Sequence, residues 1–102
     1  MHRLKKLDVV VESERLQDVL DIIESSGAKG YTNYEISSGE GKREIRQDIT
    51  GYQYPYKSTA LYVVASEEVA KKIAQRIYSE ILEESAGILF LSDVEVIRKD
   101  HF

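Results

Sequence analysis

The order in which strand and helix patterns follow one another restricts the fold of this chain most. Residues 4–12 have the pattern of a strand, and three aliphatic side chains share one of its sides: Leu7, Val9 and Val11. Ser13 is a predicted helix N-cap, and apolar residues recur at helical spacing up to Gly27, a natural C-terminal stop. A second strand is predicted over about residues 29–37. The sequence therefore opens with a βαβ unit.

The same order returns in the second half of the sequence. A third strand is predicted from Ser58 to Ala65, and Ser66 is predicted to cap a second amphipathic helix. Six residues form the apolar stripe of that helix: Val69, Ala70, Ile73, Ala74, Ile77 and Ile81. A fourth strand runs from Gly87 through Ile97. Two βαβ units in 102 residues predict one domain, residues 1–102, of the α+β class. The expected fold is a ferredoxin-like βαββαβ sandwich, a four-stranded antiparallel sheet with two helices on one face.

Three of these strands are apolar on both sides, although the helices cover only one face of such a sheet. The alternating sets are Leu7, Val9 and Val11 with Val10; Leu61 and Val63 with Tyr62 and Val64; and Ile88 and Phe90 with Leu89 and Leu91. Burying an aliphatic side chain contributes about 1.5–3 kcal/mol, so the second face favours burial against further copies of the chain. We therefore expect a closed oligomer. The alternative is that some of these residues are singly exposed at an edge, which is common.

The connection between the second and third strands, about residues 38–57, is far longer than a hairpin turn. Connections in small domains usually take about four to six residues, and a much longer one is functional or disordered. Gly39 and Gly41 precede Lys42, Arg43 and Arg46. Glycine amides beside guanidinium groups suit a phosphate or carboxylate. The spacing is not that of a Walker motif, and a solvated excursion of mixed charge explains the composition equally well.

Three tyrosines alternate in the same connection: Tyr52, Tyr54 and Tyr56. Tyrosines at a period of two either extend a strand or form a contact surface for a partner, because exposed tyrosine is favoured at interfaces. The residues alone leave both interpretations open.

Composition excludes several classes of function. The net charge of −4 disfavours a broad nucleic-acid surface, which needs a basic stripe. The absence of cysteine removes disulfides, thiolate metal sites and cysteine nucleophiles. No apolar run in the sequence is long enough to span a bilayer, so a cytoplasmic location is predicted.

Three segments carry a resemblance to a known family: SSGAKGYT, GEGKREIR and AGILFLSDVEVIR. They resemble the P-II signalling family, and most closely its P-II-like branch associated with bicarbonate uptake and carboxysomes. The resemblance implies a non-enzymatic homotrimer whose long connection, the T-loop, lies beside adenine-nucleotide sites between subunits. It implies adenine near Thr32, backbone from Gly39 and Gly41, and phosphates held by Arg43 and Arg46. Two further residues would complete the site: Gly87 and Arg98.

The chain departs from that family in one loop. Before the fourth strand the sequence is EESAGILF, whereas P-II proteins proper carry a glycine-rich loop with a lysine that holds a polyphosphate. With fewer donors and two nearby acids, we expect AMP, ADP or cyclic AMP to bind at least as well as ATP. The resemblance also implies bicarbonate as a co-ligand. It implies a partner in a membrane bicarbonate transporter or the carboxysome. Our hypothesis is that the ligand selects the shape of the long connection, which then contacts this partner through Tyr52, Tyr54 and Tyr56.

Other classes with this strand order remain as alternatives. An RNA-recognition module should show a basic-glycine-aromatic signature in its third strand, and STALYVVA has none. An acylphosphatase-like enzyme would use Asn33 and Arg43 on a phosphate, but no nucleophile stands out. A metal-binding trimer of the CutA kind would need more ligands than His2 and His101 supply. We therefore predict no catalytic residue and no metal ligand.

Overall fold

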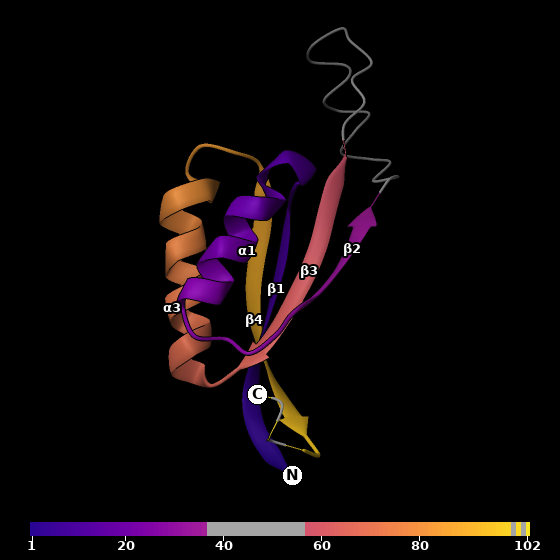
Figure 1. The fold of residues 1–102 in the computed structure, drawn as a ribbon, viewed down its shortest axis with the longest axis vertical. Coiled ribbons are helices and arrows are strands. Elements are labelled where there is room, and N and C mark those ends of the chain that lie inside the picture. The colour runs from indigo at the N-terminus through magenta and orange to yellow at the C-terminus, as the bar shows by residue number, and fades with distance from the viewer. Residues whose placement is uncertain (37–56, 99, 101) are drawn as a thin grey trace, which may run out of the picture.

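The strands and helices follow one another in the predicted order (Figure 1). The computed structural model describes residues 1–36, 57–98, 100 and 102. Strand β1 spans His2–Glu12, and a 3-10 turn, η1, spans Ser13–Arg15 ahead of helix α1, Leu16–Ser25. The remaining elements are β2 (Thr32–Ile36), β3 (Ser58–Ala65), α3 (Glu67–Ile77), the π-helical turn η2 (Tyr78–Leu82) and β4 (Gly87–Val96).

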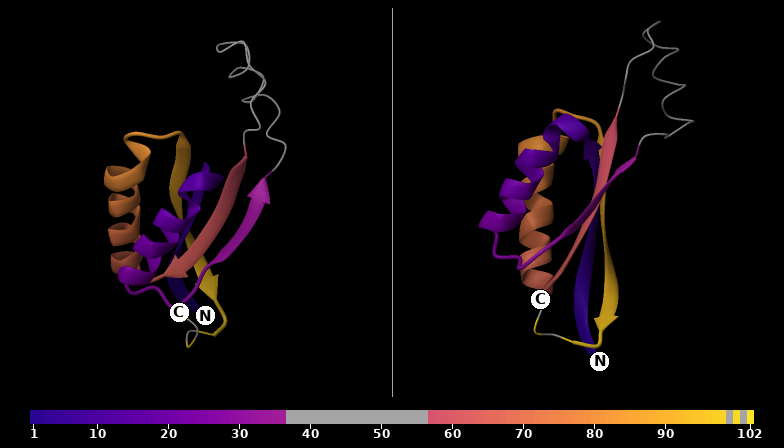
Figure 2. Two further views of the ribbon diagram at one scale, coloured as in Figure 1. Left: turned by 45° about the horizontal axis from the view of Figure 1, so that its top comes forward. Right: turned by 45° about the vertical axis from the view of Figure 1, so that its right-hand side comes forward.

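The four strands form one antiparallel sheet with the order β2-β3-β1-β4. The register pairs Leu7 of β1 with Val63 of β3 on one side and with Leu91 of β4 on the other. Both helices lie on the same face of this sheet, as the turned views in Figure 2 show. The predicted ferredoxin-like sandwich is therefore confirmed.

The core lies between the sheet and the two helices. Its buried residues come from β1, α1, β3, α3 and η2: Leu7, Val9, Val11, Val19, Leu20, Ile22, Ile23, Leu61, Val63, Ile73, Ile77 and Ile81. Leu89 and Leu91 of β4 pack against this cluster from the edge of the sheet. The odd-numbered residues of β1, β3 and β4 thus face the helices, which follows from the two-residue period of a strand.

The helix caps confirm one predicted boundary and correct another. Ser66 caps α3 as predicted, because its side chain accepts a hydrogen bond from the Val69 amide at 3.3 Å. The prediction that Ser13 caps α1 is wrong, since Ser13 lies in η1, three residues before the helix begins. The Ser13 hydroxyl instead lies 2.8 Å from that of Thr59, and its amide donates to the Lys57 carbonyl at 3.0 Å. These bonds hold the start of β3 against the turn after β1.

The predicted end of α1 agrees with the structure, whereas the predicted start of β2 does not. Gly27 follows α1 with a φ of 98°, the left-handed conformation in which helices commonly end. Strand β2 begins at Thr32 rather than near residue 29, because pairing with β3 starts only where Thr32 meets Tyr62. The predicted T-loop, residues 38–57, falls almost entirely on residues 37–56, which lie outside the described residues.

The sheet face opposite the helices carries the second apolar set. Ile88 and Phe90 of β4 are 47% and 53% exposed, and the neighbouring Val10, Tyr62 and Val64 are half-buried. The register places these side chains in adjacent rows across β3, β1 and β4. The prediction of a sheet that is apolar on both faces is confirmed in the single subunit.

Candidate functional site

Three of the predicted nucleotide-binding residues lie in the described part of the chain: Thr32, Gly87 and Arg98. The others, and the predicted partner-contact tyrosines, lie outside it: Gly39, Gly41, Arg43, Arg46, Tyr52, Tyr54 and Tyr56. Thr32 is exposed at the start of the edge strand β2 and pairs with Tyr62 of β3. By register, Thr32 shares the open sheet face with Tyr62.

Gly87 has a packing reason to be glycine. It opens β4 opposite Val11 of β1. A Cβ atom at this position would lie 2.6 Å from the Val10 carbonyl oxygen and 2.6 Å from Leu82 Cδ2. The carbonyl belongs to the backbone of a central strand and cannot move aside. The close approach of β4 to β1 therefore requires a residue without a side chain here, whatever ligand the loop binds.

Arg98 lies beyond the far end of β4 and is exposed. Its guanidinium lies 3.7 Å from the Asp100 carboxylate. A guanidinium has five N–H donors, so this one exposed pair leaves Arg98 with donors that can bind an anion.

One subunit does not bring these three residues together. Gly87 begins β4 and Arg98 follows its last residue, Val96. Ten strand residues at about 3.3 Å each place the two ends about 30 Å apart. Thr32 is on β2, at the opposite edge of the sheet from β4 (Figure 1). A single nucleotide is too short to touch both ends of β4 in the same subunit.

The backbone amides of the turn between η2 and β4 donate hydrogen bonds within the turn itself, a feature that the sequence did not reveal. The Glu83 amide donates to the Tyr78 carbonyl at 3.1 Å, across the π-helical turn. The amides of Glu84 and Ser85 donate to the Ile81 carbonyl at 3.2 and 3.1 Å. Three successive N–H groups are therefore already satisfied within the turn. A phosphate in this place would find fewer free donors than an open glycine-rich loop offers.

The shortest ion pair of the described residues lies at the junction of β1 and β4 with α3. Lys5 of β1 donates to the Asp93 carboxylate of β4 and lies 3.7 Å from Glu67 at the start of α3. The hydrogen bond from Lys5 lowers the pKa of Asp93, and the same bond raises the pKa of Lys5. All three groups are on the helix side of the sheet.

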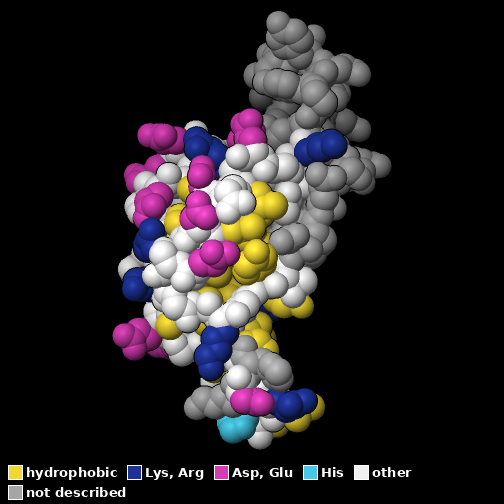
Figure 3. All heavy atoms as spheres, viewed as in Figure 1, with side chains coloured by type: hydrophobic (Ala, Val, Ile, Leu, Met, Phe, Trp, Pro, Cys, Tyr) yellow, Lys and Arg dark blue, Asp and Glu magenta, His cyan; other side chains and the backbone are white. Residues whose placement is uncertain are grey.

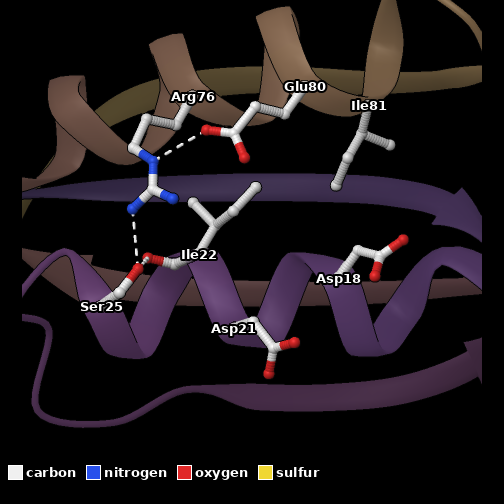
Figure 4. Close-up of a pocket in the computed structure, with 7 residues that line it drawn as sticks. All are labelled: Asp18, Asp21, Ile22, Ser25, Arg76, Glu80 and Ile81. Atoms are coloured by element: carbon white, nitrogen blue, oxygen red, sulfur yellow. Dashed lines mark hydrogen bonds and ion pairs between the residues drawn. The ribbon is translucent and has the colours of Figure 1, made fainter.

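A groove of about 360 Å³ separates α1 from α3 and η2 (Figure 4). Arg76 crosses it, donating to the Ser25 hydroxyl at 2.7 Å and to Glu80 at 2.9 Å. On α1, Asp21 accepts from Gln17 at 3.0 Å. Figure 3 shows acidic side chains spread over this helix face, with lysines and arginines among them. The groove holds none of the predicted site residues, and its bonds stabilise the packing of the two helices.

Within the described residues, no group of three or more His, Cys, Asp or Glu side chains is placed to hold a metal ion. The helices found in that part of the chain are all too short or too polar to cross a membrane.

The strand order, the helices on one face and the long β2–β3 connection define an α+β sandwich of the ferredoxin-like class. More particularly, the chain belongs to the P-II family, because the family model described as Nitrogen regulatory protein P-II matches residues 4–101. The predicted resemblance to this family is confirmed.

Solved structures share this fold. A PII-like signaling protein from Thermus thermophilus is 32% identical, with a TM-score of 0.79, and the match covers 99% of this chain and 96% of that one. CPII, a nitrogen regulatory PII-like protein from Thiomonas intermedia, is 23% identical, with a TM-score of 0.76 and coverage of 99% and 98%. That CPII structure contains ADP, AMP and bicarbonate. Another CPII structure, with a TM-score of 0.78, 23% identity and coverage of 99% and 95%, contains ADP and bicarbonate.

Proposed function

We propose that this protein is a non-enzymatic P-II-like regulator, a homotrimer that binds adenine nucleotides in clefts between its subunits. The observation that carries the proposal is the separation of Gly87 and Arg98 along the full length of β4. If both residues serve one nucleotide, they must come from different copies of the chain. The open apolar face, with Ile88 and Phe90 about half exposed, supplies the surface on which the copies meet.

The proposed site takes residues from two copies. The adenine lies near Thr32, and the backbone of Gly39 and Gly41 runs alongside the nucleotide. The guanidinium groups of Arg43 and Arg46 bind the phosphates, because a bidentate arginine fits their geometry. The turn before Gly87 closes the cleft in one copy, and Arg98 reaches the phosphates from its neighbour.

The preferred nucleotide has few phosphates. The amides of Glu83, Glu84 and Ser85 are occupied within the turn, and the two glutamates are exposed beside it. A third phosphate placed there would meet carboxylates rather than free N–H groups, which is unfavourable. We therefore expect AMP, ADP or cyclic AMP to bind at least as tightly as ATP. ADP and AMP in CPII support this range of ligands.

Bicarbonate is the proposed co-ligand, as it accompanies ADP in CPII. The nucleotide and bicarbonate together would select the conformation of the T-loop, about residues 38–57, and the conformation would select a partner. Tyr52, Tyr54 and Tyr56 are the proposed contact residues. The proposed partner is a membrane bicarbonate transporter or a carboxysome-related protein, with the regulator itself in the cytoplasm and at the membrane when the transporter is bound.

The test is calorimetric titration of a sample of known solution mass with AMP, ADP, ATP and cyclic AMP, with and without bicarbonate. We expect a trimer that binds at least one of these nucleotides. Arg98→Ala should weaken binding by at least about tenfold, the effect of losing one hydrogen bond to a charged group. Arg15→Ala is the matched control, because Arg15 is on the helix side, 3.6 Å from Asp18. A lone subunit that produces no binding heat with any nucleotide contradicts the proposal.

A further inference from the structure

An ion pair interrupts the apolar rows of the open sheet face. Lys6 and Asp8 of β1 both point to this face, with Lys6 Nζ 3.4 Å from the Asp8 carboxylate. Lys6 Nζ also lies 4.8 Å from the centre of the Tyr62 ring, a cation–π contact. The register places Asp8 between Tyr62 and Phe90. The two charges thus occupy the middle of the surface that is proposed to meet other copies.

Among the described residues, no further ion pair completes this one within the subunit. A separation of 3.4 Å is longer than a good N–H···O hydrogen bond. An ammonium has three donors, and a carboxylate has about four acceptor positions, so both groups keep unused capacity. In the single subunit, the Lys6 and Asp8 side chains are already largely covered, being 35% and 21% exposed. A second copy that covers Phe90 and Tyr62 would remove these charges from water and would have to supply their missing partners.

The apolar rows alone do not fix how two copies align. The hydrophobic effect has no direction, and rows of valine, isoleucine and phenylalanine can slide over one another. A slip of two residues along a strand moves the ends by about 7 Å and keeps the same side chains facing inwards. Such a slip would part the Gly87 end of one copy from the Arg98 end of the next.

We propose that Lys6 of one copy pairs with Asp8 of the neighbouring copy, and that these pairs set the register of the assembly. Each copy carries both charges. In a closed ring, the Lys6 ammonium of each copy would pair with the next copy, and its Asp8 carboxylate would pair with the previous one. The proposal rests on the proposed function only for the claim that the open face meets other copies. Lys5, the adjacent cation, points to the helix face and is bound to Asp93, so it does not compete.

The first experiment exchanges the two charges. The variant that combines Lys6→Asp with Asp8→Lys should assemble with itself, because its pairs are restored across each interface. It should not assemble with the wild type, because every mixed contact would join like charges. Native mass spectrometry of the variant mixed with isotope-labelled wild type measures this directly. We expect mixed assemblies to be depleted at least about tenfold below the binomial proportions. Mixing in binomial proportions would overturn the proposal.

The second experiment covers the case in which the exchanged variant does not fold. Asp8→Asn removes one charge with little change of shape. We expect its dissociation constant for self-association to rise by at least about tenfold, because Lys6 of the next copy loses its partner. Asp21→Asn, on the exposed side of α1, is the matched control and should associate as the wild type does. Unchanged association of Asp8→Asn would overturn the role of the pair.

The two proposals fail differently. A wild type that stays a lone subunit at every concentration removes the proposed assembly and this inference with it. A wild type that assembles and binds nucleotide, but co-assembles freely with the exchanged variant, removes only this inference.

Discussion

At the scale of single residues, packing restricts the sequence more strictly at Gly87 than at the other glycines that the structure describes. We expect Gly87→Ala to lower the free energy of unfolding by about 1–3 kcal/mol, the usual effect of overpacking. The cause is the 2.6 Å approach of a new Cβ to the Val10 carbonyl. Urea denaturation measures the change. Gly30→Ala is the control, because nothing lies within 4 Å of its Cβ position. Equal stability of the two variants would contradict the packing explanation.

Asp93 gives the second prediction at this scale. Its pKa is lowered by the hydrogen bond from Lys5, so the unfolded chain takes up this proton at a higher pH than the folded chain. The contribution to stability is present above the unfolded pKa of about 3.9 and is lost as the pH falls through the folded value. We expect Asp93→Asn to be less stable than the wild type at pH 6.

As the pH falls below about 4, this difference should shrink. Urea midpoints at several pH values test the expectation, with Asp21→Asn as the control acid. A difference between wild type and Asp93→Asn that stays constant down to strongly acidic pH would contradict it.

At the scale of secondary structure elements, the cap of α3 is a local determinant that the sequence revealed correctly. Ser66→Ala should lower the free energy of unfolding by about 1 kcal/mol, because the Val69 amide loses its acceptor. Ser79→Ala is the matched control, since the Ser79 hydroxyl donates only a 3.4 Å bond to the Arg76 carbonyl on an exposed surface. Thermal unfolding followed by circular dichroism compares the two. If Ser79→Ala lowered the free energy of unfolding as much as Ser66→Ala, the stabilising role of the Ser66 cap would be contradicted.

Elements with strong periodicity were predictable from the sequence, and elements set by long-range contacts were not. The third strand, Ser58–Ala65, has the predicted bounds because its apolar run from Ala60 to Ala65 is uninterrupted. Ser13 was predicted as a cap because the pattern cannot show that Thr59, far along the chain, binds its hydroxyl. The π-helical turn at Tyr78–Leu82 has no sequence signature, yet it determines which amides remain free.

The candidate site was predictable only in part, for a related reason. The sequence shows that Gly87 and Arg98 lie at opposite ends of one predicted strand, and hence that they are far apart. It does not show which of the two alternating sets in β4 faces the helices. The register with β1 decides this, placing Leu89 and Leu91 against the core and leaving Ile88 and Phe90 on the open face.

At the scale of the whole molecule, the open face predicts how the protein associates. We expect Phe90→Glu to convert the proposed assembly into folded single subunits, because a carboxylate without a partner would be buried in the interface. Tyr78→Glu is the control, since Tyr78 is 60% exposed on η2, on the helix side. Sedimentation velocity measures the mass of each variant, and circular dichroism checks that it is folded. An unchanged mass for Phe90→Glu would show that the open face is not the interface.

The length of β4 has a consequence for mixtures of damaged chains. Its two ends are about 30 Å apart, so in the proposed trimer each cleft takes the Gly87 end from one chain and the Arg98 end from another. A chain defective only at Arg98 and a chain defective only in the turn before Gly87 would each bind nucleotide weakly alone. Combined in one ring, they would form an intact cleft wherever the undamaged end of one chain meets the undamaged end of the other, so two such defective alleles should complement each other.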